Sequence, residues 1–152
     1  MTWLTSTAPG DTDLDRVFGL APGIYARYRD LYEQLWSRKA VSPVLLEVCR
    51  LRIAQLIGCP PELAHRTPAA QAAGLTEEKI AALRQWPSSP HYSAVERACL
   101  SFAECYVIDA HAVTDEQCAA LNEHLSPEEI AALTTAIAVF DAMARFQVAL
   151  DV

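Results

Sequence analysis

Apolar side chains recur along this chain at the three- and four-residue spacing of amphipathic helices, and capping residues separate the apolar runs. Ser42 and Pro43 suit the N-cap and first position of a helix that continues to Ile57, where Gly58 supplies the stop. The same signals predict further helices at about 22–36, at 76–85, after the capping boxes that open at Ser93 and Thr114, and at 126–150.

Sustained alternation of apolar and polar residues is missing from the sequence, so β-structure is not expected. Residues 1–20 are predicted to be an irregular segment with a short turn at Leu14–Phe18. Because the sequence has neither an internal repeat nor a low-complexity linker, we interpret residues 21–152 as one helical domain. The pattern as a whole predicts an all-α fold.

Composition narrows the classes of function. The chain has 152 residues, of which 52% are hydrophobic and 20% charged, so a globular domain with a real core is expected. A net charge of −7 without a basic cluster argues against a nucleic-acid partner. No uncharged apolar run is long enough to span a bilayer, and the polar, acidic start MTWLTSTAPGDTDLD lacks the order of a signal peptide. We therefore expect a cytoplasmic protein with neither a nucleic-acid nor a membrane partner.

The five cysteines form an odd set without the paired spacing of a metal site or a disulfide scaffold, so reduced and mostly buried thiols are expected, with no metal and no cofactor. They are Cys49, Cys59, Cys99, Cys105 and Cys118.

Two helices hold charged residues of interest. On the helix that ends at Ile57, Glu47 and Arg50 lie one turn apart on a polar arc. The last helix is apolar or small on nearly every side, which indicates a central helix or one that a neighbouring subunit buries. Its Asp141 and Arg145 are spaced as a structural ion pair, and we favour that role over a catalytic one.

Cys59 lies at a corner where two opposing effects act on its thiol. Gly58 ends one helix and Pro60 suits the first position of the next, which makes Cys59 the predicted N-cap. Pro61 has no N–H group, so the first free donor near the sulfur belongs to Glu62. The helix dipole favours the thiolate, whereas the Glu62 carboxylate opposes it or serves only in a capping box. We hypothesise that Cys59 is the one thiol with a lowered pKa.

The order of landmarks between Ser42 and Leu150 resembles the carboxymuconolactone decarboxylase / alkylhydroperoxidase D superfamily. The landmarks are SPVLLEVCRLRIAQLIGC, HR, AAGLTEEKIAAL, a tryptophan, YSAVERACLSFAE, VTDEQCAALNEHLSPEEIAALTTAIA and a final arginine. The resemblance implies an alkylhydroperoxidase D-like helical bundle that forms homo-oligomers, as trimers or paired trimers. It also implies an antioxidant, peroxidase-related activity on a small-molecule substrate, supported by a thiol reductant.

The peroxidase branch of this family uses Cys-x-x-Cys-x-x-x-His and a glutamate twelve residues before the first cysteine. Carried over by position, Glu47 and Cys59 match the glutamate and the first cysteine. Glu62 stands in place of the second cysteine and Arg66 in place of the histidine, while His65 falls one residue short. The resemblance therefore implies a site with an incomplete motif.

Proline alters the geometry expected downstream of the cysteine. Thr67 and Pro68 look like a fresh helix start, and a break there would let His65 move toward the place of the family histidine. On a continuous helical hairpin, Glu47 and Arg66 would lie within roughly 5 Å along the axis. Such a carboxylate–guanidinium pair cannot relay protons, because arginine stays protonated.

Three interpretations remain open at this point. One is a one-cysteine peroxide reductase in which Cys59 attacks and Glu47 supports proton transfer. Another is a non-redox, lactone decarboxylase-like enzyme that acts on a small anionic substrate with Glu47, Glu62, His65 and Arg66. The last is a small-molecule-binding or scaffold oligomer whose ancestral site has decayed.

Overall fold

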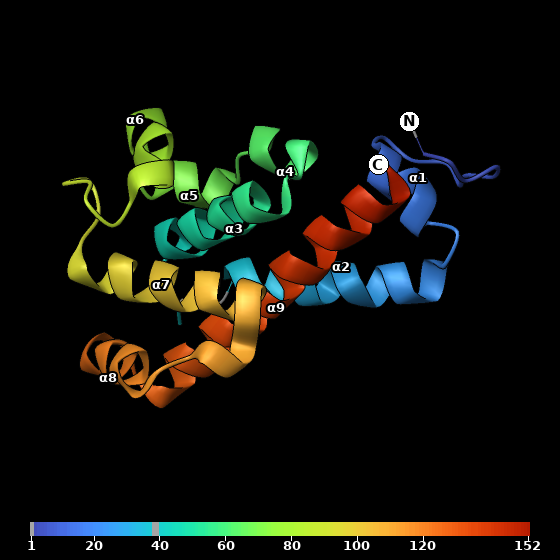
Figure 1. The fold of residues 1–152 in the computed structure, drawn as a ribbon. Coiled ribbons are helices and arrows are strands. Elements are labelled where there is room, and N and C mark those ends of the chain that lie inside the picture. Colours follow the sequence, from blue (N-terminus) through green and yellow to red (C-terminus); the bar gives the residue numbers. More distant parts are fainter. Residues whose placement is uncertain (1, 38–39) are drawn as a thin grey trace.

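A computed structural model describes residues 2–37 and 40–152, and this described part is helical without a strand. The all-α prediction is confirmed. Figure 1 shows the helices in chain order. They are α1 (Asp13–Phe18), α2 (Pro22–Ser37), α3 (Pro43–Ile57), α4 (Pro60–Ala64), α5 (Pro68–Ala72), α6 (Glu77–Ala81), α7 (Ala94–Asp109), α8 (Asp115–His124) and α9 (Pro127–Leu150), with 3-10 turns at Ala82–Gln85 and Ala110–Ala112.

Helix α3 is the centre of the fold and packs mainly against α7 and α9. Its Val48 and Ile53 are completely buried, as are Leu100 of α7 and Ile137 of α9. Because apolar side chains cover most of the circumference of α3, two of its three charged residues, Glu47 and Arg50, are buried in the interior with them. This burial decides the chemistry of the site described below.

Most helix boundaries follow from their capping residues. Ser93, Thr114 and Ser126 each form a capping box with the residue three positions later. Gly58 ends α3 in the left-handed conformation, with φ of 74°, which a glycine adopts without strain. The predicted break before Pro68 is also confirmed, because α4 ends at Ala64 and α5 starts at Pro68.

The N-terminal segment is more ordered than the sequence indicates. Thr12 caps α1 in a capping box, and Val17 of this helix is buried. The Phe18 ring packs against those of Tyr25 and Phe146, which holds α1 between α2 and the end of α9. Figure 1 shows the two chain ends side by side there, and the Trp3 indole donates to the Ala149 carbonyl at 2.9 Å.

Helix α9 has the length and apolar composition of a membrane span, but it is a core helix of this fold. Leu133 and Ile137 are completely buried, and α9 packs along α3. Its predicted ion pair forms, with Arg145 Nε 2.9 Å from an Asp141 oxygen. Arg145 is half exposed and also donates to the Val107 carbonyl, which fits a structural role.

Candidate functional site

A buried ion pair on α3 lies at the base of the site. Arg50 donates from Nε and from one terminal nitrogen to the two oxygens of Glu47, both at 2.8 Å. The Thr67 backbone N–H also donates to Glu47 at 3.2 Å. Burial raises the pKa of a carboxyl, but here the Arg50 hydrogen bonds and charge outweigh it and hold the pKa of Glu47 below its ordinary value. Glu47 is therefore a fixed carboxylate.

Arg50 joins α3 to α4 with the rest of its N–H groups. It donates to the Glu62 carbonyl at 2.8 Å, to the Glu62 carboxylate, and to the His65 carbonyl at 2.9 Å. Together with the two bonds to Glu47, these use all five guanidinium N–H groups. Burial alone would lower the pKa of Arg50, but Glu47 and then Glu62 raise it above its usual value. Arg50 therefore fixes the position of α4.

Cys59 is the N-cap of α4, as predicted, but its thiol is not activated. The residue is completely buried in a small apolar cluster with Ala54 and Ala144, against which Ile57 and Leu63 pack. This burial, and secondarily the charge of the Glu62 carboxylate, raise the pKa of the Cys59 thiol, while the Glu62 N–H and Arg50 oppose them. The hypothesis of a lowered pKa is wrong, because α4 is short and desolvation outweighs its dipole.

The other thiols offer no partner for Cys59. Cys49 and Cys99 are completely buried in the main core, and burial raises the pKa of both, that of Cys99 to about 12. Cys105 is partly exposed and Cys118 exposed, on α7 and α8. Within the described residues, the histidines, cysteines and carboxylates do not gather into a metal site.

Arg66 is not the partner of Glu47. Its guanidinium bonds Glu77 at 2.8 and 3.1 Å and also donates to the Leu63 carbonyl. The expected Glu47–Arg66 pair assumed a continuous helix after Cys59, whereas the chain leaves the helix after Ala64 and turns Arg66 toward α6. The i,i+3 spacing of Glu47 and Arg50 was the signal that could have identified the actual pair.

His65 and Glu62 border a cavity of 430 Å³ that opens between α1, α2, α4 and α9. Tyr28 and Tyr32 of α2 form another wall, and Gln147 of α9 donates to Glu62 at 2.5 Å. Burial raises the pKa of Tyr32 to about 12, and burial likewise raises that of Tyr28. Both tyrosines therefore present neutral hydroxyl groups at physiological pH.

The residues that line this cavity do not include Cys59 or Glu47. The structure thus brings Glu62 and His65 together around an open space, and keeps Cys59 and Glu47 beneath α4. Sequence reasoning missed Tyr28, Tyr32 and Gln147, because their positions depend on how α2 and α9 pack around α4.

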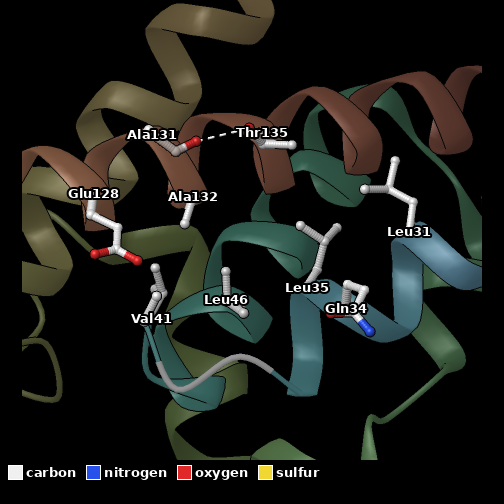
Figure 2. Close-up of a pocket in the computed structure, with 10 residues that line it drawn as sticks. Leu31, Gln34, Leu35, Val41, Leu46, Glu128, Ala131, Ala132 and Thr135 are labelled. Atoms are coloured by element: carbon white, nitrogen blue, oxygen red, sulfur yellow. Dashed lines mark hydrogen bonds between the residues drawn. The ribbon is translucent and has the colours of Figure 1, made fainter.

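A second cavity, of 460 Å³, has a different character. Figure 2 shows it between α2, the start of α3 and the start of α9. Its walls are mainly apolar, with Leu31, Leu35 and Leu46 among them, and Glu128 is the charged residue at its edge. It contains none of the predicted site residues and is a poor place for acid–base or thiol chemistry.

Comparisons with known proteins agree with this architecture. The model of the carboxymuconolactone decarboxylase family matches residues 22–104. The uncharacterized protein YdfG of Bacillus subtilis is 26% identical over 119 residues, which are 78% of this chain and 81% of YdfG. The uncharacterized protein YnjA of Escherichia coli is 29% identical over 123 residues, 76% of this chain and 64% of YnjA.

Two solved structures share the fold. The first is ATU0492 of Agrobacterium tumefaciens, a protein of unknown function described as a candidate antioxidant defence protein AhpD, with a TM-score of 0.77 and 24% identity. The match covers 88% of this chain and 92% of ATU0492. The second is the debrominase Bmp8 in complex with 2,3,4-tribromopyrrole, with a TM-score of 0.78 and 20% identity over 89% of this chain and 72% of Bmp8. At these identities the likeness establishes the alkylhydroperoxidase D-like fold alone.

Proposed function

This chain belongs to the carboxymuconolactone decarboxylase family, and we propose that it is an alkylhydroperoxidase D-like oxidoreductase that works with one cysteine, Cys59. The observation that supports this proposal is the arrangement around α4. Cys59 lies at its N-terminus, where the Glu62 N–H and the Arg50 guanidinium partly offset the burial that raises the pKa of its thiol. No thiol stands at position 62, so the reducing equivalents come from a separate thiol compound.

The proposed cycle uses one hydroperoxide and two molecules of external thiol. The Cys59 thiolate attacks the outer oxygen of the hydroperoxide, the O–O bond breaks, and the departing alkoxide takes up the proton that the thiol gave up. Cys59 is left as a sulfenic acid. One thiol then displaces water to form a mixed disulfide, and a second thiol releases a disulfide and restores Cys59.

Burial makes this chemistry slow in the resting conformation. Cys59 is completely buried in the cluster with Ala54 and Ala144, so α4 has to move before an organic hydroperoxide reaches its sulfur. The five bonds of Arg50 resist that movement. We therefore propose that Cys59 reacts only when the contact between α3 and α4 opens.

Trapping of the sulfenic acid tests the proposal. The protein carrying Cys105→Ser and Cys118→Ser is treated with hydrogen peroxide or an organic hydroperoxide in the presence of dimedone, and the adduct is mapped by mass spectrometry. We expect one adduct, on Cys59, and peroxide consumption with a monothiol that Cys59→Ser abolishes. Oxidation of Cys49 or Cys99 at the same rate as Cys59, or undiminished turnover by Cys59→Ser, would disprove it.

A second candidate function needs no thiol. It is favoured by the cavity beside Glu62, whose lining includes His65, Tyr28 and Tyr32 but not Cys59. In this alternative His65 moves a proton on a bound small molecule, and the neutral tyrosine hydroxyls donate hydrogen bonds to it. Turnover of a small-molecule substrate that persists in Cys59→Ser and is lost in His65→Ala would support this alternative over the thiol cycle. The lactone decarboxylase-like interpretation with a small anionic substrate loses its main support, because Arg66 pairs with Glu77 and does not line the cavity.

A further inference from the structure

The N-terminal segment supplies part of the cavity beside Glu62, although it lies outside the match to the family. The family model begins at residue 22, whereas Thr12, Asp13, Leu14 and Asp15 all line the cavity. The segment is well anchored, because Val17 is buried. This wall is therefore a feature of this chain rather than of the matched family region.

The charges around the cavity are predominantly negative. Its lining contains Asp13, Asp15 and Glu62, and no lysine or arginine among the described residues. The cluster beneath it combines one guanidinium, Arg50, with two carboxylates, Glu47 and Glu62, which leaves a net charge of −1. Asp13 is paired with Arg16, so it adds little.

Asp15 adds a negative charge that no ion pair within the described residues cancels directly. Its carboxylate accepts from the Tyr25 hydroxyl, from the Thr12 hydroxyl at 2.7 Å and from the Thr12 N–H at 3.0 Å. The hydrogen bond from Tyr25, and then those from Thr12, hold the pKa of Asp15 below its ordinary value. Asp15 is therefore ionised at neutral pH. Arg29 lies over the Tyr25 ring and attracts Asp15 only weakly.

Another wall of the cavity is aromatic. Tyr28 and Tyr32 line the cavity, and their rings pack at tilted angles in a series that runs from Phe18 of α1 to Trp36 of α2. Aromatic faces together with nearby carboxylates are surroundings that attract organic cations. Carboxylates beside a concave site repel anions and raise the local concentration of cations, as the net charge of −7 also does.

We propose that this cavity binds a small organic cation, and that Asp15 of the N-terminal segment gives it this selectivity. Glu62 adds to the attraction, while Tyr28 and Tyr32 contact the apolar part of the ligand. The inference depends on the cavity and not on the thiol of Cys59, so it stands or falls separately from the proposed oxidoreductase activity.

Three probes of similar shape test the charge selection: benzyltrimethylammonium, benzyl alcohol and benzoate, titrated by calorimetry at low ionic strength. We expect the cation to bind at least about tenfold more tightly than benzoate, with the alcohol between them. Added salt should narrow the difference. Equal binding of benzoate and the cation, or no binding of the cation at about 10 mM, would overturn the proposal.

Two variants separate charge from structure. Asp15→Asn keeps an acceptor for Tyr25 but removes the charge, and should reduce the ratio of cation to benzoate affinity by roughly three- to fivefold. Tyr25→Phe removes the hydrogen bond from Tyr25 to Asp15 but keeps the charge of Asp15, and should leave the ratio unchanged. Equal effects of the two variants would mean that Asp15 only anchors α1, and the proposal would fail.

A carboxylate outside the cavity lining and a variant without the Cys59 thiol complete the test. Asp30→Asn, which removes an exposed carboxylate of α2, should leave the ratio unchanged. The titrations are repeated with Cys59→Ser, which cannot perform the thiol cycle. If this variant binds the cation and the wild type has no peroxide turnover, only the proposed oxidoreductase activity is contradicted. If the wild type turns over peroxide but binds the cation and benzoate equally, only this inference is contradicted.

Discussion

Glu62 occupies the position of the second cysteine of the two-cysteine peroxidases that the sequence resembles, and its carboxylate binds Arg50 and Gln147. The substitution does more than remove a thiol. The Glu62 carboxylate is a second acceptor, after Glu47, for the buried Arg50 guanidinium. It also accepts a hydrogen bond from Gln147, which connects α4 to α9. Glu62 therefore has a structural role in this chain, and its charge adds to the burial that raises the pKa of the Cys59 thiol.

The order in which the thiols react follows from their burial. At pH 7 we expect iodoacetamide to modify the exposed Cys118 first and Cys59 at least about tenfold more slowly. Because the thiolate is the reactive form and burial raises the pKa of Cys59, its rate should keep increasing as the pH rises past the ordinary thiol value of 9.0. Labelling followed by peptide mapping measures both. Faster labelling of Cys59 than of Cys118 at pH 7 would contradict the burial seen here.

Arg50 and Arg52 give a matched pair of substitutions on one helix. Arg50→Lys loses the bidentate contact with Glu47 and leaves buried acceptors without donors, and should lower the free energy of unfolding by about 3 kcal/mol. Arg52→Lys affects a partly exposed pair with Glu104 and should cost less than about 1 kcal/mol. Urea denaturation of both variants checks this. Equal losses would mean that the Arg50 cluster does not hold α3 to α4.

Among the elements, helices with strong local signals were predicted well from sequence. A helix boundary of this kind depends on only four or five neighbouring residues. The expected boundaries are present at the capping boxes of Ser93, Thr114 and Ser126 and at the glycine stop of Gly58. The α4–α5 break was also readable, because Pro68 cannot continue a helix.

The contacts of the site were less predictable than its helices. The pair of Glu47 and Arg50 could be predicted from their i,i+3 spacing on one helix. The contact of Arg66 with Glu77 instead depends on the direction that the chain takes after Ala64, which no local rule gives. The cavity walls depend on tertiary packing, since they bring Tyr32 of α2 and Gln147 of α9 to α4. The predicted thiol pKa failed for a related reason, because desolvation is a property of the packed structure.

Helix α4 offers a direct test of how much of a two-cysteine site can be rebuilt. Glu62→Cys places a thiol three residues after Cys59 and should raise dithiol-dependent peroxide consumption above that of the parent. Arg66→His should add nothing to it, because residue 66 faces Glu77 and not the Glu47 cluster. A coupled peroxide assay on the single and double variants measures this. A further large increase from Arg66→His would show that residue 66 reaches the site.

At the scale of the molecule, the exposed apolar surface lies elsewhere than the sequence suggests. Leu133, Ile137 and Phe140 of α9 are buried within one chain, so they give no reason for self-association. The exposed large apolar side chains include Ile24 and Leu31 of α2, which are 66% and 42% exposed. They lie seven residues apart on one face, and Leu31 borders the apolar cavity of Figure 2.

We expect a homo-oligomer in which a second copy covers this part of α2 and the adjoining apolar cavity, since exposed apolar side chains beside an apolar hollow are typical of an interface between subunits. Sedimentation at micromolar concentration should give a species heavier than the 16.7 kDa chain. Leu31→Glu should shift it toward the monomer, because the new carboxylate would be buried without a partner.

Ile108→Glu alters an equally apolar residue that is 71% exposed at the end of α7, and should leave the oligomer intact. A wild-type monomer would contradict self-association itself, and dissociation by Ile108→Glu alone would place the interface at α7 instead of α2.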